Sequence, residues 1–282
     1  MRRPELPEPV FEARDVCYSY PGGPPILCEV NFSVRAGECV AVLGANASGK
    51  STLLHLLDGL YFPTEGKVMA FGRELTEESV ETPPFSREFR REVGYLFQNS
   101  DAQLFCPTVE EELAFGPLQL RRPAEEVEAR VADTLRLFGL EHLRERSPQT
   151  LSGGEKKKVA LASIITGGPR VILADEPTAD LDPRTQQWLL ELLFELHRAG
   201  LTLVTATHDL VAAADLADRV IVLSEDHRVA ADAPTDTVLR DLDLLLAVNL
   251  IHVHSHAHGS ITHVHPHAHP VQHDDHEHPH RG

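Results

Sequence analysis

The chain has 282 residues, 42% of them hydrophobic, which predicts one or two domains with a sizeable buried core. Its 26 basic and 43 acidic side chains give a formal net charge of −17, which excludes a broad basic surface for nucleic acid. No apolar run is long enough to span a bilayer, and the four cysteines form no C-x-x-C pair. We therefore expect a cytosolic protein with reduced thiols, which reaches a membrane only through a partner.

Short apolar strands alternate with amphipathic helical stretches in the first 250 residues. In chain order we expect a strand at 39–43, helices at 52–60 and 124–138, a strand at 171–174, a helix at 188–197 and a strand at 202–205. Strands separated by helices predict a parallel α/β sheet covered on both faces. Residues 107–150 predict an inserted helical region, in which Gly139 ends a helix and Glu110-Glu111-Glu112 form a solvated face.

A phosphate-binding pattern follows the first expected strand. The segment Gly44-Ala45-Asn46-Ala47-Ser48-Gly49-Lys50-Ser51 fits G-x-x-x-x-G-K-[ST], and Thr52 continues into a helix. The glycines let backbone N–H groups surround phosphates, and the helix N-terminus adds its positive dipole end. We expect Lys50 to bridge the β- and γ-phosphates and the Ser51 hydroxyl to ligate Mg²⁺.

Two further strands end in side chains suited to ATP hydrolysis. Residues 171–174 run into Asp175, aimed at the Mg²⁺ shell, and Glu176, which can polarise the attacking water. His208 stands at the carboxyl end of the strand at 202–205, where ligands of α/β sheets bind. Taken alone, a histidine at such a position is more often structural than catalytic.

Between these motifs stands Leu151-Ser152-Gly153-Gly154-Glu155, and from about Val10 to Leu250 the sequence resembles the ATP-binding cassette family. The resemblance implies a RecA-like parallel core, an antiparallel N-terminal β-subdomain and a helical subdomain at about 99–165, within a nucleotide-binding domain at 9–250. It implies that Leu151, Ser152, Gly153, Gly154 and Glu155 contact ATP bound to a second subunit. The resemblance leaves open whether the two subunits form a homodimer or a heterodimer.

The resemblance also assigns roles to single residues. Tyr20 matches the aromatic that stacks on adenine, although packing against Tyr18 is an open alternative. Gln98 matches the glutamine that senses Mg²⁺ and water, and His208 the switch histidine. Asp180-Leu181-Asp182 matches the loop that contacts the other subunit. Two positions depart from the family pattern. Ala47 stands at a free position where glycine is common, and we expect it to be tolerated. Lys156 follows the signature motif at a position where glutamine or arginine is common.

The stretch from Phe97 to Pro117 narrows the resemblance to the energy-coupling-factor ATPases of cobalt and nickel importers. In that group the segment after Gln98 faces a membrane subunit, so Asp101 to Phe105 are candidates for transmitting closure to transport. The resemblance thus implies an ATPase that docks on the cytoplasmic face of a membrane and powers uptake of nickel or cobalt. Two alternatives remain: a vitamin as cargo, or a cytosolic metal store or chaperone gated by ATP.

Histidines mark the C-terminal region 251–282, which holds twelve of the seventeen in the chain. Two blocks repeat with a period of eleven residues and alternate histidine with other residues: His252, His254, His256, His258 and His263, His265, His267, His269. Neutral imidazoles suit Ni²⁺ and Co²⁺, and Asp274, Asp275 and Glu277 add oxygen donors. We expect a disordered tail that captures metal, with a weakly functional tail as the alternative; its interspersed pattern differs from a cloning tag.

Overall fold

The computed structural model describes residues 9–258 and 261–268, with side chains up to His252. Its largest described sheet has six strands in the order β10-β9-β3-β8-β7-β6. These strands are β3 (Cys39–Leu43), β6 (Val93–Leu96), β7 (Val171–Asp175), β8 (Thr202–Thr207), β9 (Arg219–Leu223) and β10 (Val229–Pro234). The strands from β9 to β6 run parallel, while β10 pairs antiparallel with β9. The predicted parallel α/β sheet is confirmed, because all three expected strands lie in it.

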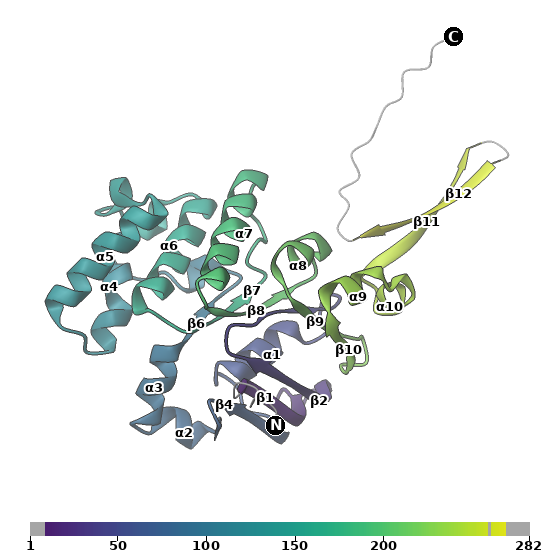
Figure 1. The fold of residues 1–282 in the computed structure, drawn as a ribbon, viewed down its shortest axis with the longest axis horizontal. Helices are drawn as coiled ribbons and strands as arrows, with labels where there is room; N and C mark the ends of the chain where they lie inside the picture. The colour runs from purple at the N-terminus through teal and green to yellow at the C-terminus, as the bar shows by residue number, and fades with distance from the viewer. Residues whose placement is uncertain (1–8, 259–260, 269–282) are drawn as a thin grey trace, which may run out of the picture.

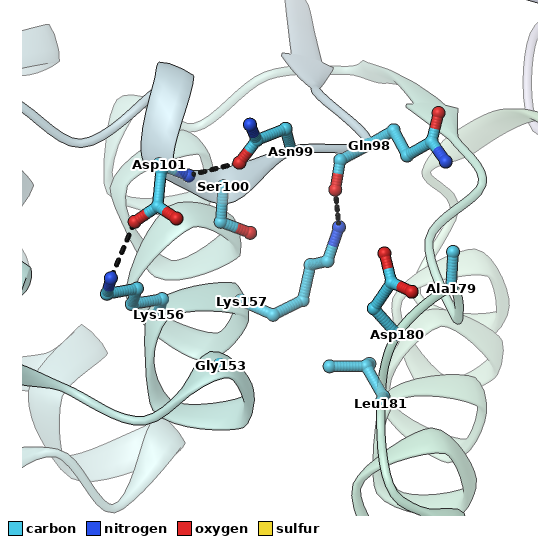
Figure 2. Close-up of a pocket in the computed structure, with 10 residues that line it drawn as sticks. All are labelled: Gln98, Asn99, Ser100, Asp101, Gly153, Lys156, Lys157, Ala179, Asp180 and Leu181. Carbon is cyan, nitrogen blue, oxygen red and sulfur yellow. Dashed lines mark hydrogen bonds and ion pairs between the residues drawn. The ribbon is translucent and has the colours of Figure 1, made fainter.

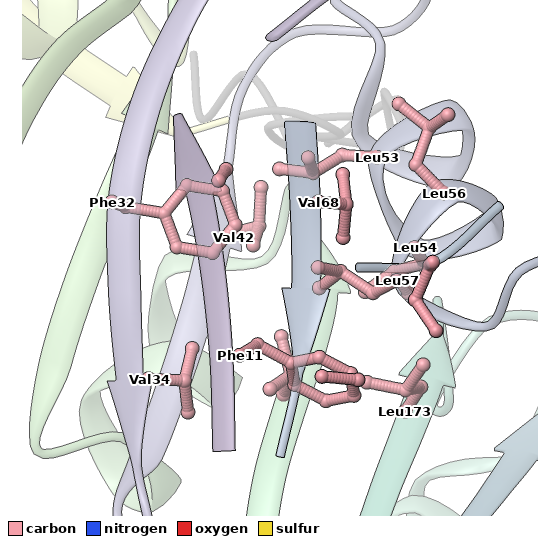
Figure 3. Packing of buried hydrophobic residues seen from close by; sticks show 14 of the residues in the cluster. Phe11, Phe32, Val34, Val42, Leu53, Leu54, Leu56, Leu57, Val68 and Leu173 are labelled. Atoms are coloured by element: carbon pink, nitrogen blue, oxygen red, sulfur yellow. The ribbon is translucent and has the colours of Figure 1, made fainter. Parts of the chain in front are cut away.

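A four-stranded antiparallel sheet in the order β2-β1-β4-β5 lies beside the parallel one (Figure 1). Its strands are β1 (Pro9–Ser19), β2 (Pro25–Arg35), β4 (Glu65–Ala70) and β5 (Arg73–Glu74). Helix α1 (Lys50–Leu57) packs into a shared apolar cluster that includes Leu57 and Val68, and in which Figure 3 shows Phe11 close to Leu173 of β7. This cluster joins both sheets behind the phosphate-binding segment, so burial of apolar area holds the start of α1 in place.

Helices α4 (Val109–Gln119), α5 (Ala124–Phe138) and α6 (Gly153–Gly167) come between β6 and β7 and form the predicted helical part. Helix α5 has the predicted bounds, buries Val127, Val131 and Leu135 on one face, and ends at Gly139 with a left-handed φ of 65°. The acidic run differs from the prediction. Glu112 is only 3% exposed, and its Oε2 accepts hydrogen bonds from the backbone N–H groups of Phe105 and Cys106.

The remaining helices are α2 (Glu77–Glu81), α3 (Phe85–Glu92), α7 (Pro183–Arg198), α8 (Leu210–Leu216), α9 (Thr235–Arg240) and α10 (Leu242–Ala247), with short 3₁₀ turns at Ser100–Ala102, Glu141–Leu143 and Pro148–Thr150. Helix α7 begins five residues before the predicted start at 188, because the Asp182 carboxylate accepts from the backbone N–H groups of Arg184 and Thr185 and Pro183 is its first residue. In the part of the chain that is described, no helix has both the length and the apolar character needed to cross a bilayer.

The C-terminal region after Leu250 contains a hairpin, a pairing that the sequence analysis did not include. Strand β11 (Ile251–His258) pairs antiparallel with β12 (Ile261–Ala268), and Figure 1 shows this hairpin projecting beyond α9 and α10. Histidine alternates with other residues along both segments, and such a period of two favours extended strands. The predictions at His269, Asp274, Asp275 and Glu277 lie outside the described residues.

Candidate functional site

The segment Gly44–Ser51 links β3 to α1, as the sequence predicts, and its glycines are required by the backbone. A Cβ atom on Gly49, whose φ is 104°, would come within 2.6 Å of the backbone oxygen of Ile26. A Cβ atom on Gly44 would come within 2.8 Å of the Leu223 oxygen. Ala47 adopts a left-handed φ of 64°, so this departure from glycine is accommodated at some cost in backbone strain.

Lys50 is buried at the first turn of α1 and faces the loop that precedes it. Its Nζ donates to the backbone oxygens of Gly44 at 2.9 Å and Ala45 at 3.1 Å. It also lies 3.7 Å from Glu176 Oε1. Burial lowers the pKa of Lys50, while the nearby Glu176 and Asp175 work in the opposite direction. The loop thus holds the ammonium group of Lys50 at the place where the family motif predicts the phosphates of ATP.

Asp175 and Glu176 are both buried at the carboxyl end of β7. Burial raises the pKa of Asp175, and hydrogen bonding to Ser51 lowers it. Among the described side chains, Asp175 Oδ1 and Ser48 Oγ are buried without a hydrogen-bond partner. Oxygen donors of this kind suit a hard cation such as Mg²⁺, so the residues present fit Mg²⁺ bound together with phosphates.

Glu176 is held by side chains from the end of β8. His208 Nδ1 lies 2.9 Å from Glu176 Oε1, and the Thr207 hydroxyl donates to Oε2 at 3.2 Å. Glu176 itself adopts a left-handed φ of 40°, an uncommon conformation for a residue with a side chain. The structure therefore brings Lys50, Glu176 and His208 together, as the sequence predicts.

Tyr20 lies beside the phosphate-binding segment and is 40% exposed. Its hydroxyl is 3.2 Å from the Thr52 hydroxyl on α1. Tyr18 is buried and stacks on Tyr61 at 5.5 Å between ring centroids. Tyr20 packs edge-on against both rings, so the packing against Tyr18 that was the alternative is also present. Of the two tyrosines, Tyr20 is therefore the one available to a planar ligand.

A cavity of about 360 Å³ brings together three segments that are distant in sequence. Figure 2 shows Gln98 after β6, Gly153 at the start of α6, and Asp180 before α7 around it. Ser152 caps α6, because its hydroxyl oxygen accepts from the Glu155 backbone N–H at 3.4 Å, and in return its own backbone N–H and hydroxyl donate to the Glu155 carboxylate at 2.8 and 2.7 Å. None of the hydrogen bonds or ion pairs described links Leu151–Glu155 to the phosphate-binding segment of the same chain.

Lys157 is a residue of this region that the sequence analysis missed. It is buried on α6, and its Nζ donates to the backbone oxygens of Gln98 at 2.7 Å and Phe97 at 3.2 Å (Figure 2). Burial lowers the pKa of Lys157 to about 8, against the attraction of Asp175 and Asp180. The only sequence signal was its place in the run Lys156-Lys157-Lys158, which looks like a solvated charge cluster.

The model of the ABC transporter family matches residues 27–179, more than half of the chain. The chain belongs to the ABC transporter family. This membership, together with the assembled Lys50, Glu176 and His208, identifies it as an ABC ATPase. The prediction of this family from the motifs at Gly44–Ser51 and Leu151–Glu155 is confirmed.

Three curated relatives of this ABC ATPase have similar lengths. A putative ABC transporter ATP-binding protein of Methanosarcina acetivorans is 51% identical, over 89% of this chain and 92% of that protein. The nickel import ATP-binding protein of Rhodobacter capsulatus is 48% identical, over 86% and 96%. An energy-coupling factor transporter ATP-binding protein of Methanothermobacter thermautotrophicus is 42% identical, over 86% and 76%.

Two solved structures share the fold of this ABC ATPase. The cbiO1 protein of Clostridium perfringens, part of the ABC transporter complex cbiONQ, superposes with a TM-score of 0.73 and 31% identity, over 86% of this chain and 95% of that one. A dimeric ATP-binding cassette in a post-hydrolysis state, bound to ADP and Pi, gives a TM-score of 0.71 and 29% identity, over 80% and 98%.

Proposed function

We propose that this ABC ATPase is the ATP-hydrolysing subunit of an energy-coupling-factor importer that takes up nickel or cobalt. The observation that carries the catalytic part is the contact of Glu176 with His208 and Lys50 at the end of β7. The cargo rests on similarity, since relatives carry the names of a nickel import ATP-binding protein and of an energy-coupling factor transporter ATP-binding protein.

In this proposal the residues of one chain divide the work at one ATP. Tyr20 stacks on adenine, and the loop Gly44–Thr52 binds the phosphates, with Lys50 on the β- and γ-phosphates. Glu176 orients and deprotonates the attacking water, and His208 holds the geometry around the γ-phosphate. Ser51, Gln98 and Asp175 hold Mg²⁺, which neutralises phosphate charge when bound.

A second ABC subunit completes each ATP site. Leu151–Glu155 of one subunit contact the ATP bound to the other subunit, and the loop Asp180-Leu181-Asp182 faces that other subunit. Support for this comes from the exposure of Ser152 and Gly153 at the start of α6, which leaves both accessible to another chain. A solved relative is itself dimeric. The subunit pair lies at the cytoplasmic face of the membrane, bound to integral membrane subunits.

We place the docking surface for the membrane subunits around Phe105. Its ring is 62% exposed and meets the Phe115 ring edge-on at 4.8 Å, and Leu118, three residues after Phe115 on α4, is 53% exposed. An apolar group of this kind on a charged protein suits an interface with another protein. The segment Asp101–Phe105 follows Gln98 directly, so movement at the ATP has a short route to this surface.

Uptake of radioactive nickel and cobalt by cells that express the complete transporter tests the proposal. We expect uptake of one or both metals with the wild-type chain and none with Glu176→Gln. Intact ATPase activity without uptake of either metal would overturn the metal cargo, and metal-independent uptake of a vitamin would then identify the alternative. A chain that binds metal but never co-purifies with membrane subunits would instead favour a cytosolic store or chaperone.

A further inference from the structure

The register of the C-terminal hairpin aligns histidines with histidines. In the β11–β12 ladder His252 is opposite His267, His254 is opposite His265, and His256 is opposite His263. Directly opposite residues of an antiparallel pair share one face of the ribbon, and so do residues two apart on one strand. His258, two residues after His256 and opposite Ile261, lies on the same face. Seven histidine positions therefore share one face, which we call the histidine face.

The period of the sequence repeat makes this alignment possible. Histidines occupy even-numbered positions in the first block and odd-numbered positions in the second, because the period of eleven is odd. The observed register pairs even with odd positions throughout. A slip of one residue would place the histidines of one strand opposite non-histidine positions. The positions of the other face hold no histidine: Ile251, Val253, Ser255 and Ala257 on β11, and Thr262, Val264, Pro266 and Ala268 on β12.

We propose that the histidine face is a binding site for a divalent transition metal ion, built jointly by both blocks. Opposite Cα atoms in such a ladder are about 4.5–5.5 Å apart, and residues two apart along a strand are about 7 Å apart. Two neighbouring pairs thus gather four imidazole-bearing residues within the reach of one ion. Neutral imidazole suits Ni²⁺, Co²⁺, Cu²⁺ and Zn²⁺. This site stands independently of the cargo proposed above.

A variant of unchanged composition tests whether the shared face matters. In the full chain, the exchanges T262H/H263T, V264H/H265V and P266H/H267P move the histidines of β12 to the opposite face. Ni²⁺ or Zn²⁺ alone is titrated at pH 7.5 against a chromophoric chelator. We expect the wild type to bind at least ten-fold more tightly than this shifted variant. Equal metal affinities of the wild type and the shifted variant would overturn the proposal of a joint site, because binding would then depend only on the number of histidines.

In the shifted variant, β12 could slip by one residue against β11 and restore the histidine pairs, so a second variant is needed. Replacing His263, His265 and His267 by alanine removes the partners of β11, while the first block and all residues after Ala268 stay. We expect the same loss of at least ten-fold in affinity. If the first block alone retains the wild-type affinity, the joint site is wrong. Because ligating imidazoles must be neutral, binding by the wild type should also weaken below about pH 6.5.

A second inference rests on the contacts of Lys157 and builds on the ATPase function. Three side-chain links join α6 to the segment that carries Gln98: Lys157 to the Phe97 and Gln98 oxygens, Gln103 Nε2 to the Ala160 oxygen, and the Lys156–Asp101 ion pair. Lys157 is the buried one of the two lysines, at 2% exposure. Removing its ammonium would leave two backbone oxygens without their charged donor.

The geometry points to Lys157 as a positioning residue that fixes Gln98 relative to the start of α6. Helix α6 begins at Gly153, and Gln98 follows β6, so the Lys157 contacts couple two segments that both line the cavity in Figure 2. In the proposed dimer these segments face different ATP molecules. A rigid link between them lets one ATP site respond to the state of the other.

Steady-state hydrolysis and ATP binding of K157M separate positioning from folding. We expect kcat to fall at least ten-fold and the Kd for ATP to stay within two-fold, with partial recovery of kcat in K157R. The matched control is K158M, since Lys158 packs over the Trp188 ring at 4.4 Å, away from Gln98. An unchanged kcat in K157M, or a loss of ATP affinity that accounts for the whole effect, would overturn the role. Failure of wild-type hydrolysis itself would instead refute the ATPase function.

Discussion

Glu176 combines burial, a left-handed backbone and three close polar partners. Its carboxylate meets His208 Nδ1, the Thr207 hydroxyl and Lys50 Nζ, at 2.9, 3.2 and 3.7 Å. A side chain held from several directions in a strained backbone has little freedom to turn away, so its orientation is set before any ligand binds. That preorganisation is what a group that orients water requires.

Glu176→Gln keeps the size of the side chain and removes its capacity to accept a proton. We expect kcat for ATP hydrolysis to fall about 100-fold or more, because a positioned general base contributes about 10²–10⁴-fold. The Kd for ATP should stay within about three-fold, as measured by equilibrium binding of a fluorescent analogue. Thr207→Val is the comparison variant, since it keeps the Glu176 carboxylate and removes the 3.2 Å contact to Oε2 together with the hydrogen bond that the Thr207 hydroxyl accepts from the Asp209 backbone N–H. Wild-type hydrolysis by Glu176→Gln would show that another group activates water.

Gly49→Ala tests the backbone requirement of the phosphate-binding loop. The added methyl group would lie 2.6 Å from the Ile26 oxygen at a φ of 104°, so we expect a loss of stability of at least about 2 kcal/mol and no ATP binding. The control is Gly167→Ala at the end of α6, where a Cβ meets nothing within 4 Å. Thermal unfolding of both variants checks the difference; equal melting temperatures would contradict the steric account.

At the scale of elements, Asp58 and Arg90 connect the end of α1 to α3. Arg90 Nη1 donates to Asp58 Oδ2 at 2.9 Å and to the Asp58 backbone oxygen at 3.0 Å. Asp58 is buried, and burial raises its pKa to about 6, in spite of the attraction of Arg90. The ion pair therefore fixes geometry between two helices while its carboxylate carries a cost of desolvation.

The raised pKa of Asp58 fixes the sign of a pH dependence. The Asp58 carboxyl keeps its proton up to about pH 6 in the folded state but only up to about pH 3.8 in the unfolded state. Protonation therefore stabilises the folded state fully below about pH 3.8, and this contribution is lost as the pH rises to about 6. A shift of about two pH units corresponds to about 3 kcal/mol at most. Asp58→Asn should remove this part of the decline in the free energy of unfolding, measured by urea denaturation at pH 4 and pH 7. A decline identical to that of the wild type would contradict the assignment.

The sequence predicted the elements whose local pattern agrees with their environment. Helix α5 has the predicted bounds, because one apolar stripe and a terminal glycine specify it, and β3 was found because all five of its residues are apolar. The antiparallel sheet was implied only by family resemblance, since β1 and β2 carry bulges and irregular alternation that weaken a period-two signal. The pairing of β11 with β12 was not predicted, since alternation within each block does not specify the partner of a strand.

The same contrast applies to the site. Gly44–Ser51 and Asp175-Glu176 could be predicted because each motif carries its chemistry within a few adjacent residues. Glu112 and Lys157 could not, since a charged residue in a charged run looks solvated until the tertiary fold buries it against backbone donors or acceptors. Their partners lie 6 to 60 positions away along the chain, at distances that no local pattern encodes.

At the scale of the whole molecule, the segment after Gln98 connects the ATP site to an exposed apolar surface. Glu112 holds the backbone N–H groups of Phe105 and Cys106, so the Phe105 ring is presented outward from a fixed loop. Phe115 on α4 meets that ring edge-on. Phe105 lies in the loop before α4, and α4 packs against α6, whose N-cap is Ser152. We therefore expect closure around ATP to move this surface together with α6.

The double substitution Phe105→Ser and Phe115→Ser removes this apolar surface without touching the residues around Lys50. We expect the isolated chain to retain hydrolysis within two-fold and to lose co-purification with its membrane subunits, and metal uptake should fall at least ten-fold. Val211→Ser is the matched control, because Val211 on α8 is also exposed, at 67%, and lies outside the surface. Wild-type uptake by the double variant would place the membrane contact elsewhere, whereas a parallel loss of hydrolysis would indicate that the rings support the fold. Loss of uptake and of co-purification, with hydrolysis retained, is the one result that follows from a surface that docks on the membrane subunits.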